Sequence, residues 1–569
     1  MPISLSSIRN ASLMIAWFFS SIAAACEVRM PLLFSDHMVL QRDLPMRVWG
    51  WADPGESVTV SFGKDLARTI AGSEGRWNVT LRSIPANSHP QTLVITGKNT
   101  LEFHDVLVGD VWVCSGQSNM ERLLREVDYT DADLRSADDG QLRLFRVLST
   151  TAVTPQEDTK GWNGRQWMVS KPVDVKDFSA VGFFFGRELR KHLGIPIALV
   201  DSTQGGSRAQ LWTSVDSLEK HIDADPEFGS WIGQRNELLK TYPQRMIDYP
   251  EAKKSYDEKL RQWNSANDAN PEYTAEMAAW QTALNKARKE GAEHPAKVIP
   301  PILAPIAPDP PDGGPYSTFM VGNLYNSMIA PLTSFSIKGV LWYQGEANDR
   351  NAKQYQVLFP ILISDWRDKW GQGDFPFLFV QLPNLGAPAT EPVRAEDRWA
   401  KLREAQSKAL ALRNTGMVAT IDIGDPWDVH GRDKSDIGIR LSLLARHTIY
   451  REKVVPSGPS YRSMKINGRK VEVRFANHGR GLMIGVPPWT PTGKIPPVST
   501  ELHGFAIAGG DRKWFWANAA IHGNRVTVWS DKVTAPAAVR YGWADNPPCN
   551  LYNREGLPAP PFRTDDWPL

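Results

Sequence analysis

The sequence has few cysteines and no cluster of metal-ligating residues. Only three cysteines occur in 569 residues, at Cys26, Cys114 and Cys549, and none belongs to a CxxC pair. A structural zinc site needs such pairs or a Cys/His cluster, so we do not expect one here. Cys114 stands in an apolar run, which favours a buried free thiol over a disulfide with Cys549.

Neither sign of charge is in excess, because 65 Lys and Arg residues face 63 Asp and Glu residues. A net charge of +2 gives no sign of a nucleic-acid partner. Beyond the N-terminus no apolar run is long enough for a transmembrane helix. Tryptophan, in contrast, is abundant at 22 residues. Indole rings bind sugar rings, but they more often fill the cores of β-rich domains.

Residues 1–26 are typical of a signal peptide. Arg9 precedes an apolar run from Leu13 to Ala25, and the run ends in small residues that suit cleavage. The run is short for a membrane span. We therefore expect export to the periplasm or to the outside of the cell. Cys26 follows the small residues directly, so a lipid anchor at this cysteine is the alternative to soluble export.

The apolar pattern changes twice along the chain. Near both ends, short strands of alternating polarity are separated by turn residues, which predicts β structure. Between them apolar strands alternate with helices, which predicts a mostly parallel sheet. A charged insertion at about 216–315 carries apolar residues at helical spacing and predicts a pair of helices. We predict an N-terminal β-domain over 27–105, an α/β domain over 106–455 and a C-terminal β-rich domain over 456–569.

Polar motifs stand a few residues past several predicted strands of the α/β domain. Functional residues of parallel sheets gather at this edge. Acyl transfer needs a nucleophile, a base, an orienting acid and donors for the oxyanion, and the motifs offer candidates for each. In chain order they are Ser118 in "CSGQSNM", Gly205 and Gly206 in "QGGSRAQLW", Gln344 and Asn348 in "WYQGEAND", and Asp428 and His430 in "DPWDVHGRD".

Each motif alone is ordinary. A serine in a turn, a Gly-Gly pair or an Asp-x-His is usually structural. Their order along the chain, each near a strand end, is what points to an esterase. The nucleophile elbow of α/β-hydrolases is excluded, because that turn needs glycine two residues after the serine, where Met120 stands.

Taken together, these motifs resemble the sialate O-acetylesterase family, within the SGNH (GDSL-like) hydrolases. Segments near both ends, "LFSDHMVLQRDLPMRVWGWADPGE" and "SDKVTAPAAVRYGWADNPPCNLYNREGLPAPPFRTD", resemble the flanking parts of that family. The resemblance covers nearly the whole mature chain except the insertion. It implies an SGNH-type three-layer α/β/α domain with β-sandwich-like domains on either side. It also implies a serine esterase that removes O-acetyl groups from sugars without a metal or cofactor.

The resemblance assigns the catalytic residues by position. Ser118 matches the nucleophile and His430 the base. The general SGNH pattern places the acid three residues before the histidine, where this chain has Trp427. Asp428, two residues before the histidine, is therefore the expected acid, and Asp425 is the reserve candidate.

The resemblance also assigns the oxyanion hole. The backbone N–H of Ser118 and that of Gly206, or of Gly205, are expected to donate to the oxyanion. Gln344 is expected to add a side-chain amide, with Asn348 as the alternative. Three further residues are expected to contact the sugar, with Arg208 facing an acidic group: Arg208, Trp212 and Glu346.

Three other functions stay open at this stage. The same catalytic residues would serve acetylated plant polysaccharides such as xylan. A non-catalytic carbohydrate-binding protein could use the β-domains and their aromatic residues instead. A phosphoesterase is the third, but no cluster of metal ligands in the sequence supports it.

Overall fold

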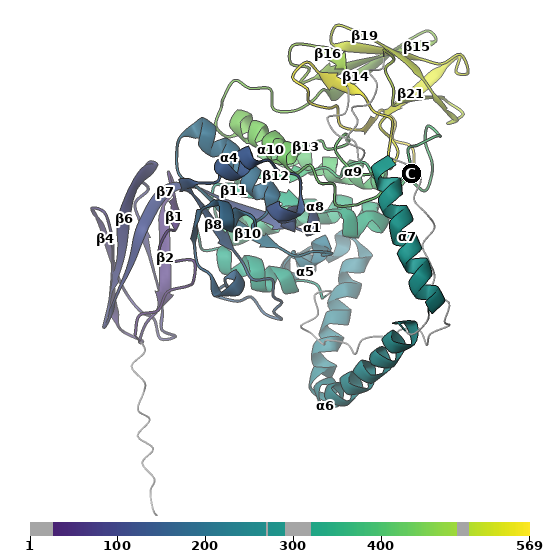
Figure 1. Ribbon diagram of the computed structural model, residues 1–569. Helices are drawn as coiled ribbons and strands as arrows, with labels where there is room; N and C mark the ends of the chain where they lie inside the picture. The colour runs from purple at the N-terminus through teal and green to yellow at the C-terminus, as the bar shows by residue number, and fades with distance from the viewer. Residues whose placement is uncertain (1–26, 269–270, 291–319, 486–499, 569) are drawn as a thin grey trace, which may run out of the picture.

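The computed structural model describes residues 27–268, 271–290, 320–485 and 500–568 (Figure 1). The predicted signal peptide and Cys26 lie outside these ranges. Among the described residues, no helix is both long and apolar enough to cross a bilayer. Cys114 and Cys549 are both free thiols, and Cys114 is fully buried, as its apolar neighbours predicted.

A mostly parallel sheet forms the centre of the chain (Figure 1). Its strand order is β13-β12-β11-β7-β10-β8-β9, and only β9 runs antiparallel to its neighbour. The central strands are almost entirely buried, because helices pack on both faces. The strands are β7 (Thr100–Gly116), β8 (Asp139–Arg146), β9 (Met168–Ser170), β10 (Ile197–Thr203), β11 (Gly339–Tyr343), β12 (Phe377–Val380) and β13 (Thr415–Val418).

Large aromatic side chains fix the helices to the two faces of this sheet. Trp112 of β7 packs edge-on against Phe185 of α4. Trp342 of β11 contacts Phe359 and Trp366 of α8. Gly339 of β11 pairs with Trp112 in the ladder, and Trp342 stands three residues further along the same strand. Because successive side chains of a strand point to opposite faces of the sheet, the two indoles lie on opposite faces. The helices are α4 (Ala180–Leu193), α8 (Ala352–Trp370), α9 (Arg398–Lys408) and α10 (Ser435–Thr448), and α10 packs on α4 while α9 packs on α8.

The N-terminal region is β structure, as its alternating polarity predicted. One sheet contains β1 (Val39–Gln41), β3 (Ser57–Phe62), β4 (Asp65–Ile70), β6 (Asn87–Thr96) and the first half of β7; the other pairs β2 (Met46–Trp51) with β5 (Arg76–Leu81). The predicted boundary at 105/106 falls inside β7. This one strand pairs with β6 and β1 before it pairs with β10 and β11.

The C-terminal region is β-rich and has its own core of buried apolar residues. Its strands are β14 (Ser460–Asn467), β15 (Lys470–Ala476), β16 (Leu482–Ile484), β17 (Phe505–Gly509), β18 (Trp514–Trp516), β19 (Asn518–His522), β20 (Arg525–Trp529), β21 (Pro536–Tyr541), β22 (Leu551–Asn553) and β23 (Phe562–Arg563). Figure 1 shows this region above the carboxyl-terminal part of the α/β region.

The insertion is helical, as predicted. After α5 (Val215–Lys220) it forms α6 (Pro226–Asp268) and α7 (Pro271–Glu290). These two long helices contact each other, and α6 also contacts α5. Residues 291–315 of the predicted insertion lie outside the described residues.

Candidate active site

Ser118 lies where the central strand ends and a short helix begins. Strand β7 ends at Gly116, and Ser118 is the first residue of α1 (Ser118–Glu121). Gly116 has φ of 133°, and a Cβ there would lie 2.1 Å from the carbonyl oxygen of Tyr343 on β11. Only glycine permits this close approach. The sharp exit from the sheet therefore depends on Gly116, and it leaves Ser118 at a helix N-terminus, where anionic charge is stabilised.

The structure brings Ser118, His430 and Asp428 together. Ser118 Oγ and His430 Nε2 are 2.9 Å apart. His430 Nδ1 lies 3.3 Å from Asp428 Oδ1, and the same carboxylate oxygen accepts the backbone N–H of His430 at 2.9 Å. The reserve candidate, Asp425, accepts the backbone N–H of Trp427 through Oδ1. Of the two carboxylates, Asp428 is therefore the one placed against the imidazole.

The two neighbours of Ser118 in the sequence tie it to the other motifs. Gln117 Oε1 accepts the backbone N–H of Gly345 at 3.4 Å and that of Ala347 at 3.1 Å. Asn119 is fully buried, and its Nδ2 donates to the carbonyl of Val429, next to His430, at 2.9 Å. The glutamine thus fixes the third motif, and the asparagine fixes the loop that carries the histidine.

A buried charge pair lies behind Asn119. Its Nδ2 also donates to Glu346 Oε1 at 2.5 Å, and its Oδ1 accepts from Lys434 Nζ at 2.6 Å. Burial lowers the pKa of Lys434 to about 8, although the negative charge of Glu346 opposes that shift. Burial likewise raises the pKa of Glu346, against the hydrogen bond from Asn119 and the charge of Lys434. Asn119 thus connects the side chains of Glu346 and Lys434 to the loop that carries His430.

The Gly205-Gly206 pair lies beside Ser118. A Cβ on Gly205 would stand 3.7 Å from Ser118 Cβ and 2.8 Å from Glu121 Oε2. The Gly205 N–H donates to the carboxylate of Glu121, whose pKa is raised by burial. Gly206 has φ of 68° and open space around it. Among the described residues, no acceptor is found for the N–H of Gly206 or that of Ser118, so both donors are available to a ligand.

Comparison with known proteins places the chain in a family. Residues 312–444 match the family described as carbohydrate esterase, sialic acid-specific acetylesterase. A solved carbohydrate acetylesterase from Xanthomonas citri is 34% identical, covers 95% of this chain and 100% of its own, and superposes with a TM-score of 0.72. The chain belongs to the sialate O-acetylesterase family of carbohydrate esterases.

Curated relatives extend this similarity over the full length. Sialate O-acetylesterases from Mus musculus and Homo sapiens are 28% and 25% identical, over 95% of this chain in both cases and over 95% and 93% of their own length. This protein is accordingly a carboxylic ester hydrolase that acts on acetylated carbohydrate.

The geometry corrects the expectation for Gln344 in this esterase. Its side chain is fully buried, and Nε2 donates to the carbonyl of Ser207 at 3.2 Å and to Asn348 Oδ1 at 2.7 Å. Both amide hydrogens are therefore engaged within the protein, which leaves none for an oxyanion. Asn348 is also buried; its Oδ1 accepts the N–H of Ala209 at 3.0 Å and its Nδ2 donates to Gln210 at 3.1 Å. These two amides join the second motif to the third.

Two of the three expected sugar contacts are also corrected. Trp212 is fully buried, and its Nε1 donates to Ser207 Oγ at 2.8 Å, so it is a core residue. Glu346 accepts from Asn119 through one carboxylate oxygen, and the other oxygen is buried, so the contact that the structure shows for this carboxylate is with the protein. Arg208 is exposed, and it alone of the three is placed where a sugar could meet it.

Sequence reasoning missed Asn119, Glu121 and Lys434. Their roles depend on contacts across more than 80 residues, and in the sequence they look like ordinary helix and loop residues. One signal was available, since Asn119 stands next to Ser118 at the start of a helix.

Proposed function

We propose that this esterase removes O-acetyl groups from sialic acids, with Ser118 as nucleophile, on an SGNH-type α/β/α domain. The observation that supports it best is the 2.9 Å contact between Ser118 Oγ and His430 Nε2 at the edge of the central sheet. The family match and the sialate esterases among its relatives favour sialic acid as the sugar. The predicted signal peptide favours export, where such glycans would be met.

The mechanism follows from the contacts. His430 accepts the Ser118 proton through Nε2 as Oγ attacks the acetyl carbonyl. Asp428 stabilises the imidazolium from the Nδ1 side and holds its tautomer. The N–H groups of Ser118 and Gly206 stabilise the oxyanion, aided by the helix N-terminus. His430 then returns the proton to the departing sugar hydroxyl, and water activated by the same imidazole hydrolyses the acetyl-serine.

The test is acetate release from O-acetylated sialic acid and from acetylated xylan, side by side. We expect release from the sialic acid, and loss of that release in Ser118→Ala. Release from xylan alone would keep the mechanism but replace the substrate. Unchanged release in Ser118→Ala would overturn the assignment of the nucleophile.

A further inference from the structure

Far along the chain from Ser118, two strands present an unusual outward face. In β2 and β5, residues alternate between a buried and a more exposed side. The exposed sides pair across the ladder as Arg47 with Thr80, Trp49 with Asn78, and Trp51 with Arg76. A sheet face turned to solvent is normally polar, so two adjacent tryptophans there need an explanation. We call these six residues the Trp49 face.

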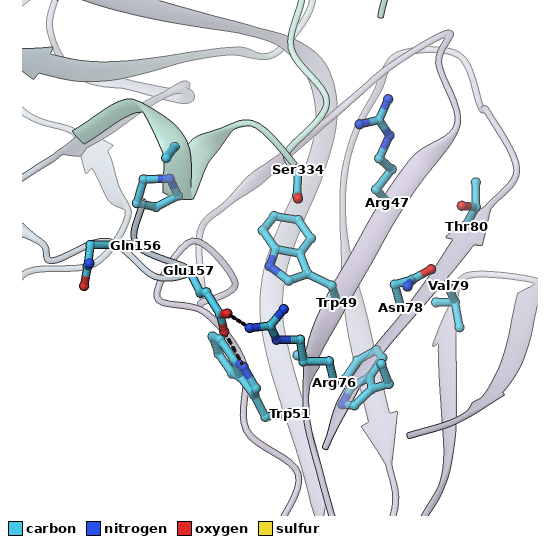
Figure 2. A pocket seen from close by; sticks show the side chains of 14 residues that line it. Arg47, Trp49, Trp51, Arg76, Asn78, Val79, Thr80, Gln156, Glu157 and Ser334 are labelled. Atoms are coloured by element: carbon cyan, nitrogen blue, oxygen red, sulfur yellow. Dashed lines mark hydrogen bonds and ion pairs between the residues drawn. The ribbon is translucent and has the colours of Figure 1, made fainter. Parts of the chain in front are cut away.

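The Trp49 face lines a cavity of about 400 Å³. Gln156 and Glu157 close it from one side, and Ser334 of the α/β region lies near the Trp49 ring (Figure 2). This volume is within the range of small-ligand sites. The cavity therefore lies between the N-terminal β structure and the α/β region and has walls from both.

The two indole rings are held in place before any ligand arrives. Trp49 packs edge-on against Phe34, with ring centroids 4.8 Å apart. Trp51 donates from Nε1 to Glu157 at 3.1 Å, and the guanidinium of Arg29 lies 5.1 Å from its ring centre. A ring that is already ordered loses little entropy on binding, which suits a stacking platform.

Hydrogen-bonding side chains line the cavity beside these rings. Asn78 and Thr80 are exposed on β5, and Ser334 and Gln156 face the cavity from other elements (Figure 2). These exposed side chains can donate to and accept from the hydroxyl groups of a sugar ring.

The charges favour an acidic ligand. Arg76 is paired with Glu157 and lies 3.8 Å from Glu74, so its charge is offset. Arg47 donates to the carbonyl of Trp370 at 2.9 Å, and among the described residues it has no carboxylate partner. Arg47 also donates to the carbonyl of Gly371 at 3.5 Å, so it lies at the C-terminal end of α8 and no carboxylate among the described residues neutralises its charge. A guanidinium beside an indole ring is complementary to a sugar ring that carries a carboxylate.

We propose that the Trp49 face is a second, non-catalytic carbohydrate site that binds an acidic sugar unit of a glycan. It would hold a glycan chain near the enzyme while the Ser118 site acts on the acetyl ester. The proposal does not depend on the acetyl chemistry, because binding here needs no turnover.

The experiment uses the full chain with Ser118→Ala, so that nothing is hydrolysed. Hydrogen–deuterium exchange is measured with 3′-sialyllactose and, as the matched neutral control, with lactose. We expect 3′-sialyllactose to protect the peptides covering 46–51 and 76–81, and lactose to protect them far less. Equal protection by both sugars, or protection confined to peptides around Ser118 and His430, would overturn the proposal.

Substitutions then locate the binding groups. Trp49→Ala should weaken the 3′-sialyllactose affinity by about tenfold, through loss of stacking. Because Trp49 also packs on Phe34, Asn78→Ala and Arg47→Gln provide variants that keep both indoles, and melting temperatures check their folding. Arg68→Ala on the neighbouring strand β4 is the matched control, since Arg68 is exposed and outside the cavity. If the three cavity variants bind as tightly as Arg68→Ala does, the site does not exist.

Discussion

The Ser118 site and the Trp49 face use polar groups in opposite ways. Around Ser118, Asn119 bonds to both Glu346 and Lys434, and burial shifts the pKa of both charged groups. On the Trp49 face, Arg76, Asn78 and Thr80 are exposed at alternate positions of β5. A connected buried network fails as a unit, whereas separate surface contacts fail one at a time. Substitutions should therefore cost far more at the first site than at the second.

The largest effect is expected from the nucleophile and its base. Ser118→Ala and His430→Ala should each lower kcat by about 10⁴-fold or more, and the double variant should be no worse than either single one. The measurement is single-turnover acetate release at equal protein concentration, with circular dichroism to check folding. Losses that multiply in the double variant would show that the two residues do not act together.

The next effect tests the network behind Ser118. Asn119→Ala removes the contacts to Val429, Glu346 and Lys434 at once, and should lower kcat by about a hundredfold through misplacement of the histidine loop. It should also cost about 1–3 kcal/mol of unfolding free energy, because buried charges lose their partner. Asn524→Ala, on an exposed turn, is the control for both measurements. A variant with normal kcat but a lowered melting temperature would limit Asn119 to a purely structural role.

Lys434 should make the activity pH-dependent. Its pKa, lowered to about 8 by burial, means that the ammonium is charged below pH 8 and becomes neutral above it. As the charge is lost, Glu346 and Asn119 lose their cationic partner, so kcat/KM should fall as the pH rises through about 8. Lys434→Met should be slower at neutral pH and lack this fall, whereas Lys408→Met, on the surface, should retain it. A wild-type profile that stays flat from pH 7 to 9 would contradict this coupling.

Gly205 tests how closely the second motif approaches the nucleophile. Gly205→Ala places a methyl group 2.8 Å from Glu121 Oε2 and should lower kcat by about tenfold. If the clash is the cause, adding Glu121→Ala should restore most of the loss. A double variant slower than Gly205→Ala would instead give the Glu121 carboxylate a role of its own.

The smallest effect is expected at Arg208. Its side chain is exposed, like Asn78 and Thr80 of the Trp49 face and unlike the buried Asn119 and Lys434. Arg208→Ala should raise KM for acidic acetylated sugars by less than about tenfold, because an exposed ion pair is weak. KM for neutral acetylated sugars should not change. An equal rise for both would remove the acidic-sugar role and leave a local rim contact.

Much of this arrangement could be predicted from the sequence, because it depends on local patterns. The helix from Ser435 buries Ile437, Leu441 and Leu444, whose i, i+4, i+7 spacing in the sequence is typical of an amphipathic helix. The segments "RWNVTL" and "VLWYQ" are typical of strands, the first through alternation and the second through an apolar run. The strand β12, at 377–380, is not evident from the sequence. Its apolar run is too short for a strand to be distinguished from a buried turn of helix by the spacing of its apolar residues.

The parts that could not be predicted depend on where side chains point. Trp212 and Gln344 lie in motifs beside the nucleophile, yet both face the core and bond to Ser207. Sequence position places a residue near a site, but it does not show whether its donors are already used. For Gln344 the folded structure is needed, because only there do the bonds to Ser207 and Asn348 use both of its amide hydrogens.

The length of strand β7 has a consequence for how the molecule unfolds. Its first six residues alternate in burial within the N-terminal β structure, and the remaining residues, which include those at the centre of the parallel sheet, are all buried. The buried apolar residues of the two regions form one continuous core, so loss of order in one region exposes apolar surface of the other. The two regions should therefore unfold in a single calorimetric transition, and a truncation at residue 105 would cut through a shared element rather than release an independent module.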